Sequence, residues 1–197
     1  MRGSKKGFTL IELLVVIAIL AILATVVVVV LNPAELLKQS RDSARVSDFA
    51  ALNSALSLYL ADVANPDLDT GNPGGLNGGT FTCGTGTSCT ASGTSAMAST
   101  TCGVRITSTT VDGTGWVAVN FTTSTSGSPL AKLPIDPVNS ASFFYAYSCS
   151  NTNLTYELNA KMESVKYGTT SATEVVTRDG GNNTQWYEIG NDPALDL

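Results

Sequence analysis

Lys5–Leu31 reads KKGFTLIELLVVIAILAILATVVVVVL and joins a basic start to a long apolar run. From Leu10 to Leu31 the run is interrupted only by Glu12 and Thr25. At about 1.5 Å of rise per residue, a helix of this length crosses a hydrocarbon core of roughly 30 Å. Basic residues and no acid precede the run, so the positive-inside rule predicts a cytoplasmic amino terminus. Everything after Leu31 is then expected outside.

A cleaved secretory signal peptide is the first alternative for this run. Such peptides have a shorter apolar core, of about 7–15 residues, that ends in a small-residue cleavage site. No A-x-A pattern closes this run before Asn32. An ordinary membrane anchor is the second alternative, and the carboxylate of Glu12 argues against it.

Glu12 needs a partner, because an ionised carboxylate near hydrocarbon costs several kcal/mol unless something pairs with it. A cut between Gly7 and Phe8 would create a new amine about one helical turn from Glu12. If such helices pack side by side with a stagger, Glu12 of one copy meets the Phe8 amine of the next. A buried pair of opposite charges is tolerable and sets the register. A single copy offers no comparable full partner, so the segment predicts assembly.

The octapeptide KGFTLIEL, residues 6–13, followed by the apolar run, resembles the type IV filament superfamily: type IV pilins and the pseudopilins of type II secretion. The close likeness covers about the first 30 residues. The resemblance implies that a membrane aspartyl prepilin peptidase cleaves after Gly7 and that the new amine of Phe8 is methylated. It also implies that Glu12 guides subunit docking, and that the apolar helices form the filament core. The implied partners are further copies of the chain, the peptidase, and an assembly platform driven by a cytoplasmic ATPase.

The helix is predicted to continue beyond Asn32-Pro33. Pro33 resembles the helix-breaking proline of pilins and is expected to kink one helix running from Phe8 to Val63. Apolar residues then recur at steps of three and four, as on one helix face. They are Val46, Phe49, Leu52, Leu56, Tyr59, Leu60 and Val63. The charged residues Lys38, Arg41, Asp42, Arg45 and Asp48 are interpreted as a solvated face, with contacts to neighbouring subunits as the alternative.

The carboxy-terminal body is predicted to be an antiparallel sheet that covers this helix face. The expected strands are Gly115–Thr123, Phe143–Cys149 and Leu154–Met162, with Val104–Thr110 and Glu174–Arg178 as weaker candidates. The fold class is α+β: a long amino-terminal helix, hydrophobic in its first half, packed on an antiparallel sheet. The predicted organisation is a leader (1–7), a transmembrane helix (8–31), its amphipathic continuation (32–64), a Gly/Ser/Thr-rich connector and loop (65–103) and the sheet head with carboxy-terminal loops (104–197).

Cysteines are confined to the part expected outside the membrane: Cys83, Cys89, Cys102 and Cys149. An even number of cysteines in that location predicts disulfides. Three pairings are possible, and Cys83–Cys89 with Cys102–Cys149 is favoured. Zinc is the rival interpretation, but the chain has no C-x2-C pair and no histidine.

The segment LPIDP, residues 133–137, resembles an element of the major pseudopilins, which often bind calcium in a carboxy-terminal loop. The Trp-Gly that commonly follows that element is missing here. Asp179, Asn182 and Asp192 are weak calcium candidates, together with Asn183 and Asp196. No ordered spacing of calcium ligands appears. No cofactor is therefore expected, and polar turns are the simpler interpretation.

Composition narrows the function. The formal charge is −5 and the chain has no histidine, which disfavours both passive binding to nucleic acid and catalysis. The leading hypothesis is a non-enzymatic pilin, held in the cytoplasmic membrane before assembly and found in an extracellular filament afterwards. A major pseudopilin is the first alternative. A DNA-uptake pilus subunit and a membrane-anchored binding module are the others.

Overall fold

The computed structural model describes residues 7–70, 74–76, 80–84, 86–91, 102–169, 172–193 and 195. The predicted leader, apart from Gly7, lies outside the described residues, as does much of the predicted Gly/Ser/Thr loop. The chain forms two compact units, Met1–Leu37 and Lys38–Leu197. We call the second unit the head.

Two helices make up the amino-terminal part of the chain. Helix α1 runs from Leu10 to Leu31, and α2 runs from Pro33 to Asp62. Between them Asn32 takes a left-handed conformation with φ 39° and ψ 75°. Pro33 is the first residue of α2, where its missing N–H is no loss. Instead of bending through Pro33, the helix stops at Leu31 and a new one begins.

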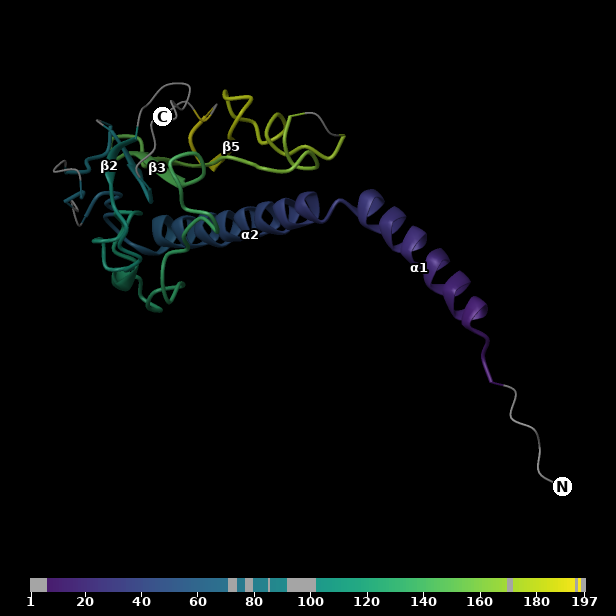
Figure 1. Ribbon diagram of the computed structural model, residues 1–197. Coiled ribbons are helices and arrows are strands. Elements are labelled where there is room, and N and C mark those ends of the chain that lie inside the picture. The colour runs from purple at the N-terminus through teal and green to yellow at the C-terminus, as the bar shows by residue number, and fades with distance from the viewer. Residues whose placement is uncertain are drawn as a thin grey trace. The chain divides into compact units, whose positions relative to one another are not determined.

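Within the head, α2 lies along one face of the sheet (Figure 1). Apart from the adjacent pair Ala55 and Leu56, its buried residues follow one another at steps of three and four, which is the spacing of a single helix face. They are Asp42, Arg45, Phe49, Leu52, Ala55, Leu56 and Tyr59. The apolar part of this face is the one that the sequence predicted. The two charged residues at its start were not expected there.

The sheet has five strands in the order β2-β1-β3-β4-β5. All neighbouring strands pair antiparallel except β1 and β2, which are parallel. Hairpin β3–β4 is its longest pairing, and the turn 151–154 connects its two strands. The bounds are β1 Thr87–Cys89, β2 Cys102–Arg105, β3 Tyr145–Ser150, β4 Thr155–Ala160 and β5 Tyr187–Gly190.

The two faces of the sheet carry different side chains. The inner face meets α2 and forms the main core, in which Phe49 stacks near Tyr145 and Tyr187. The outer face carries a second, smaller cluster of buried residues: Cys89, Ala91, Phe144, Ala146 and Trp186. Beside this cluster lies a buried polar strip formed by Ser148, Glu157, Asn159 and Glu188. Both faces of the sheet are therefore covered.

The α+β class and the β3–β4 hairpin confirm the sequence predictions. The strand predicted at Gly115–Thr123 is wrong: Trp116, Val117, Ala118 and Val119 are all fully buried in irregular chain, and a short 3-10 helix, η1, follows at Phe121–Thr123. The prediction at Glu174–Arg178 is also wrong, since this segment forms turns. Strands β1 and β5 were missed, and the parallel β1–β2 pair means that the sheet is not purely antiparallel.

Candidate functional site

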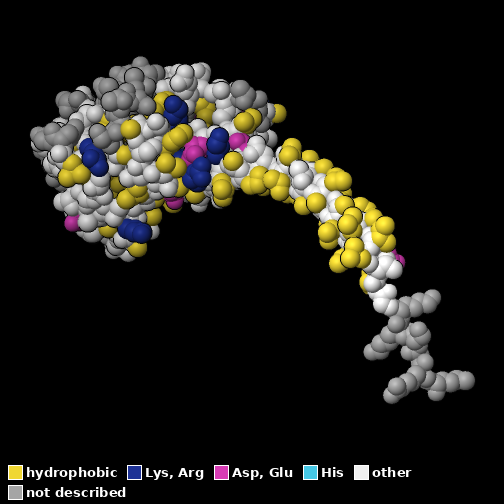
Figure 2. Space-filling view, in the orientation of Figure 1, with side chains coloured by type: hydrophobic (Ala, Val, Ile, Leu, Met, Phe, Trp, Pro, Cys, Tyr) yellow, Lys and Arg dark blue, Asp and Glu magenta, His cyan; other side chains and the backbone are white. Residues whose placement is uncertain are grey.

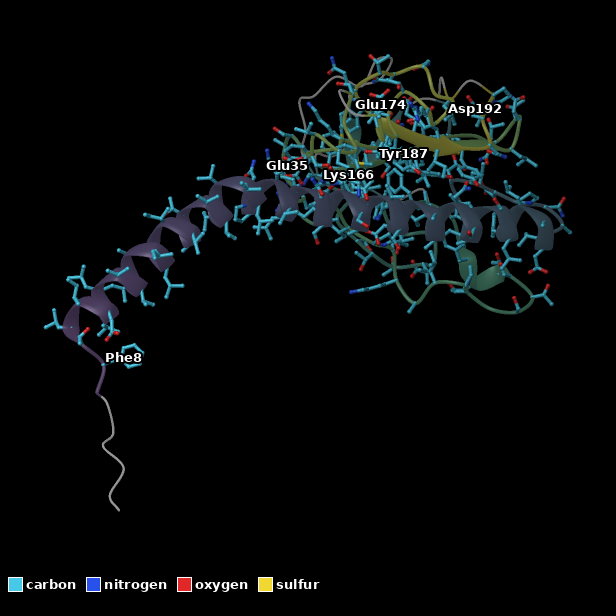
Figure 3. The ribbon with its side chains drawn as sticks, turned by 90° about the vertical axis from the view of Figure 1, so that its right-hand side faces the viewer. Phe8, Glu35, Lys166, Glu174, Tyr187 and Asp192 are labelled. Carbon is cyan, nitrogen blue, oxygen red and sulfur yellow. A yellow bond between two sulfur atoms is a disulfide. The ribbon has the colours of Figure 1, made fainter. Side chains whose placement is uncertain are left out.

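The amino-terminal segment begins with an open, extended approach to α1. Phe8 is 86% exposed and projects from the chain just before the helix (Figure 3). A side chain built at Gly7 would meet no atom within 4 Å. The bond between Gly7 and Phe8 is therefore accessible to an enzyme.

Glu12 and Thr9 close the start of α1 with a capping box. The Thr9 backbone N–H donates to Glu12 Oε2 at 2.8 Å, and the Thr9 hydroxyl donates to the same oxygen at 2.7 Å. In return the Glu12 N–H donates to Thr9 Oγ1 at 3.3 Å. The carboxylate thus has local hydrogen-bond donors in a single copy, which the sequence interpretation did not foresee. These donors are neutral, so Glu12 has no opposite charge in this capping box.

Helix α1 has no buried residue and no polar face. Hydrophobic side chains cover the visible face of this helix in Figure 2. Their exposed fractions run from 47% at Val16 to 81% at Leu10. Among the described residues, one helical run is long and apolar enough to cross a membrane, and it includes α1. Phe8, Ile11, Glu12, Val15 and Val16 line a shallow depression on it. Such a surface requires lipid or other apolar helices around it.

The head contains an ionic joint, by which we mean Asp42, Arg45, Asp136 and Glu163. Arg45 lies at its centre and is completely buried. Its Nε and NH2 donate to the two oxygens of Asp136 at 2.7 and 2.9 Å, a bidentate pair. Its NH1 contacts Asp42 Oδ1 and Glu163 Oε1, each at 2.7 Å. One guanidinium therefore connects α2 with two distant segments of the head.

The acids of the joint also hold backbone. Asp136 Oδ1 accepts the N–H groups of Val138 and Asn139 at 2.8 and 3.1 Å. Asp42 Oδ2 accepts the N–H of Ser164 at 2.7 Å. Buried charges are destabilising unless they are paired and their remaining lone pairs are satisfied. These contacts meet both conditions, so the joint anchors the 136–139 turn and the segment after β4 to α2.

Arg41 completes the rim of the joint. Its Nε and NH2 donate to the two oxygens of Glu163 at 2.9 and 2.6 Å. Burial alone would raise the pKa of Glu163, but the hydrogen bonds from Arg41 and Arg45 hold it below its ordinary value. Burial would likewise lower the pKa of Arg45, and Asp136 outweighs it, so that pKa is raised. Both groups are charged at neutral pH.

The interpretation of Asp42 and Arg45 as a solvated helix face is wrong. Both are fully buried, and Asp42 is paired with Arg45, three positions further along α2. The sequence carried a usable signal, because residues 42, 45, 49, 52, 56 and 59 continue one three-and-four pattern. Asp136 belongs to LPIDP, and nothing in that motif alone indicated an arginine partner 91 positions earlier.

The cysteines form two disulfides, as expected, but in a different pairing from the favoured one. Cys83 joins Cys149 and Cys89 joins Cys102, with Cα–Cα distances of 4.8 and 5.9 Å. The first bond attaches the connector to β3. The second joins β1 to β2 across the Gly/Ser/Thr segment. Spacing along the sequence favoured the short Cys83–Cys89 loop, whereas the strand pairing places these two residues on opposite faces of the sheet.

The calcium candidates are engaged in local contacts where the structure describes them. Asp179 accepts the N–H groups of Gly181 and Glu188 at 3.0 and 2.8 Å, and Asn182 is exposed. Asp192 lies in the turn after β5, and Asp196 lies outside the described residues. Within the described ranges, no three acidic or cysteine side chains lie close enough together to hold a metal ion. The expectation that the chain holds no cofactor is untested and stays a prediction.

The buried strip on the outer face holds an unusual carboxyl group. Burial, with Glu157 and Asp179 nearby, raises the pKa of Glu188 to about 7. Its Oε2 accepts the N–H of Asn183 at 2.9 Å. Beside it, Asn159 donates to Glu157 Oε1 at 2.6 Å. Ionisation of Glu188 would therefore place a negative charge beside two other carboxyl groups in a covered site.

One comparison with known families gives a match. Residues 2–28 match the model of the prokaryotic N-terminal methylation motif. This segment is the prepilin-type signal of type IV pilins and pseudopilins, as the residues around Gly7, Phe8 and Glu12 indicated. No curated protein and no solved structure matches the chain.

Proposed function

We propose that this chain, which carries a prepilin-type signal, is the structural subunit of a type IV pilus-like extracellular filament. The observation that carries the proposal is α1: a capped apolar helix without one buried residue, preceded by an accessible Gly7–Phe8 bond. Lipid covers such a helix in the precursor. In a filament, the α1 helices of neighbouring subunits cover it instead.

Assembly then proceeds by exchange of partners around Glu12. Prepilin peptidase cuts after Gly7, and the amine of Phe8 becomes a cation at the start of the chain. In the single subunit, Glu12 is held by the Thr9 hydroxyl and N–H. On docking, the amine of an adjacent subunit supplies the charge that this pair of neutral donors lacks. The capping box keeps the carboxylate in place until that partner arrives.

Two substitutions separate the charge of Glu12 from its capping role. Glu12→Gln keeps an acceptor for Thr9, since glutamine also completes a capping box, but removes the charge. Glu12→Ala removes both. Cells making either variant are fractionated, and sheared surface fibres and membranes are probed for the chain. Both variants are expected to be present in the membrane at the wild-type level and to be absent from fibres.

The possible outcomes distinguish a capping role of Glu12 from charge pairing, and both from the absence of a filament. Normal fibres from Glu12→Gln together with lost fibres from Glu12→Ala would limit Glu12 to capping and contradict the charge pairing. Normal fibres from both variants would remove its role in assembly. A wild-type chain found only as a membrane-bound monomer would contradict the filament proposal itself and favour a membrane-anchored binding module.

A major pseudopilin of a type II secretion system is the second candidate, and LPIDP favours it. In the head, Asp136 of that motif binds Arg45, so the motif here serves the fold. The proposed pilin differs from a pseudopilin in what its loss does. Deletion of the chain is expected to abolish surface fibres and leave protein secretion intact. Loss of secreted enzymes without loss of fibres would support the pseudopilin.

A further inference from the structure

The two disulfides are nested in sequence and lie on opposite faces of one sheet. Cys149 is part of the main core between sheet and α2, and Cys83 packs against that core. Cys89 belongs to the outer-face cluster, with Cys102 packed against it. In register, Cys89 lies opposite Ala146, three residues before Cys149 on β3. Side chains that share a strand at odd spacing point to opposite faces.

A bond between Cys83 and Cys89 is therefore incompatible with the folded sheet. It would require both sulfurs on the same face, and a strand cannot turn one residue over without moving every other side chain. Yet these two cysteines are only six positions apart, and the run GTGTS with its two glycines separates them. Short flexible loops close with the smallest entropy loss. The least hindered first bond is thus a non-native one.

Export of the chain favours the same error. Under the membrane topology on which the proposed function rests, the chain emerges from its amino-terminal side, so Cys83 and Cys89 emerge first. Cys102 follows Cys89 by 13 residues, a delay of about 1–3 s at about 5–20 residues per second. Cys149, the native partner of Cys83, is 66 residues away from it. The remaining pair, Cys102–Cys149, then closes by default.

We infer that the head of this protein is a substrate for a dithiol–disulfide isomerase on the outer side of the membrane. With Cys83–Cys89 and Cys102–Cys149 both formed, the chain has no thiol left with which to rearrange itself. After folding, Cys89 and Cys149 are also almost completely buried, so exchange has to precede packing. An external thiolate is the missing reactant.

The exchange balances without net oxidation. The isomerase thiolate attacks Cys89 Sγ, breaks the Cys83–Cys89 bond and releases the Cys83 thiolate. That thiolate attacks Cys149 Sγ, forms the native Cys83–Cys149 bond and releases the Cys102 thiolate. Cys102 then attacks Cys89 Sγ in the mixed disulfide, forms Cys89–Cys102 and returns the isomerase thiolate. Four electrons leave the protein only in the earlier step, when an oxidising disulfide such as glutathione disulfide forms the two bonds.

The test uses the full chain, reduced and denatured and then returned to detergent micelles with glutathione disulfide, with or without protein disulfide isomerase. Trypsin and cyanogen bromide, which cuts after Met97, give peptides 46–97, 98–105 and 133–161. Native bonds join all three peptides. The mispaired form gives 46–97 alone and 98–105 joined to 133–161. Fragmentation in the mass spectrometer separates the native form from the Cys83–Cys102/Cys89–Cys149 arrangement.

Without isomerase the mispaired form is expected to accumulate first, and isomerase should speed native pairing by about tenfold. The double variants Cys83→Ser/Cys149→Ser and Cys89→Ser/Cys102→Ser are the controls, since neither can mispair. Their oxidation should respond to isomerase much less than native pairing of the four-cysteine chain does, because it needs only the oxidising step and no exchange between disulfides. Equal rates for the four-cysteine chain with and without isomerase would overturn the inference, and so would equal acceleration of the double variants. Because refolding involves no export or fibre assembly, either result leaves the filament proposal to its own test.

Discussion

Helix α1 exposes apolar side chains, whereas the part of α2 at the start of the head buries charged ones. In α1 every hydrophobic side chain is exposed and no residue is buried. In the head, the completely buried positions include Asp42 and Arg45. Each segment breaks the usual distribution of residues in a water-soluble protein. The first is explained by a solvent that is not water, and the second by charges that satisfy one another.

The two segments also differ in how many kinds of surroundings suit them. Apolar packing along α1 is permissive, because lipid tails and other apolar helices cover it equally well. The ionic joint is restrictive, because the buried guanidinium of Arg45 pairs with Asp136 and Glu163 at the same time. Helix α1 therefore suits either surrounding, whereas the head holds its buried charges in pairs.

The largest loss of folding stability is expected when the central cation of the ionic joint is removed. Arg45→Met keeps most of the side-chain volume but leaves Asp42 and Asp136 buried without their partner, which should cost about 3–5 kcal/mol of folding free energy. Guanidinium unfolding of the full chain in micelles measures it, followed by the fluorescence of Trp116 and Trp186, which both lie in the head. Arg41→Met is the control and should cost far less, since Arg41 is 32% exposed and its ion pair is screened by solvent. Equal losses from both would show that burial of Arg45 is unimportant.

A charge placed on α1 tests the apolar half of the comparison. Leu20→Lys introduces an ammonium near the centre of the helix and should disfavour membrane insertion by about 2.5–3.5 kcal/mol. The fraction of chain that resists carbonate extraction reports it. Ser47→Lys, at an exposed position of α2, should change neither insertion nor unfolding beyond about 0.5 kcal/mol. Unchanged insertion of Leu20→Lys would contradict the membrane role of α1.

Glu188 predicts an unusual pH dependence for the head. Its pKa is about 7 when folded, above its ordinary value of 4.5, so the folded state binds the proton more tightly. The contribution of Glu188 to the stability of the head is then greatest below pH 4.5. It falls as the pH rises toward 7, by roughly 1–3 kcal/mol. Unfolding of wild type and Glu188→Gln at pH 5 and pH 8 measures it. The variant should gain stability relative to wild type only at pH 8, and an equal difference at both values would contradict the assignment.

The smallest effect is expected at the start of α1. Thr9→Ala removes the hydroxyl from the capping box and should weaken the first turn by about 1 kcal/mol. Hydrogen exchange of the Ile11–Leu13 amides in micelles reports it. Thr25→Ala is the matched control, because the Thr25 hydroxyl donates to Ala21 within the helix and caps nothing. Faster exchange in the Thr25 variant alone would reverse this account.

Much of the fold and of the amino-terminal segment could be predicted from the sequence, because both depend on short-range patterns. The apolar run, the residues around Gly7, the amphipathic face through Phe49 and the β3–β4 hairpin are all local in sequence. Asp136 and Arg45 meet across 91 positions, and no local pattern encodes that distance. Strand β5 was missed because Tyr187–Gly190 is short, and Trp116–Val119 misled because alternation can also occur in irregular buried chain. The disulfide pairing depends on which face of the sheet each cysteine occupies.

We propose that Lys5–Leu31 is a processing site joined to an assembly helix. Mass spectrometry of the amino terminus of the chain isolated from its native cells tests it most directly. The account predicts a mature chain that begins at Phe8 with an N-methylated amine. A chain that begins at Met1, or one cut beyond Leu31, would contradict it.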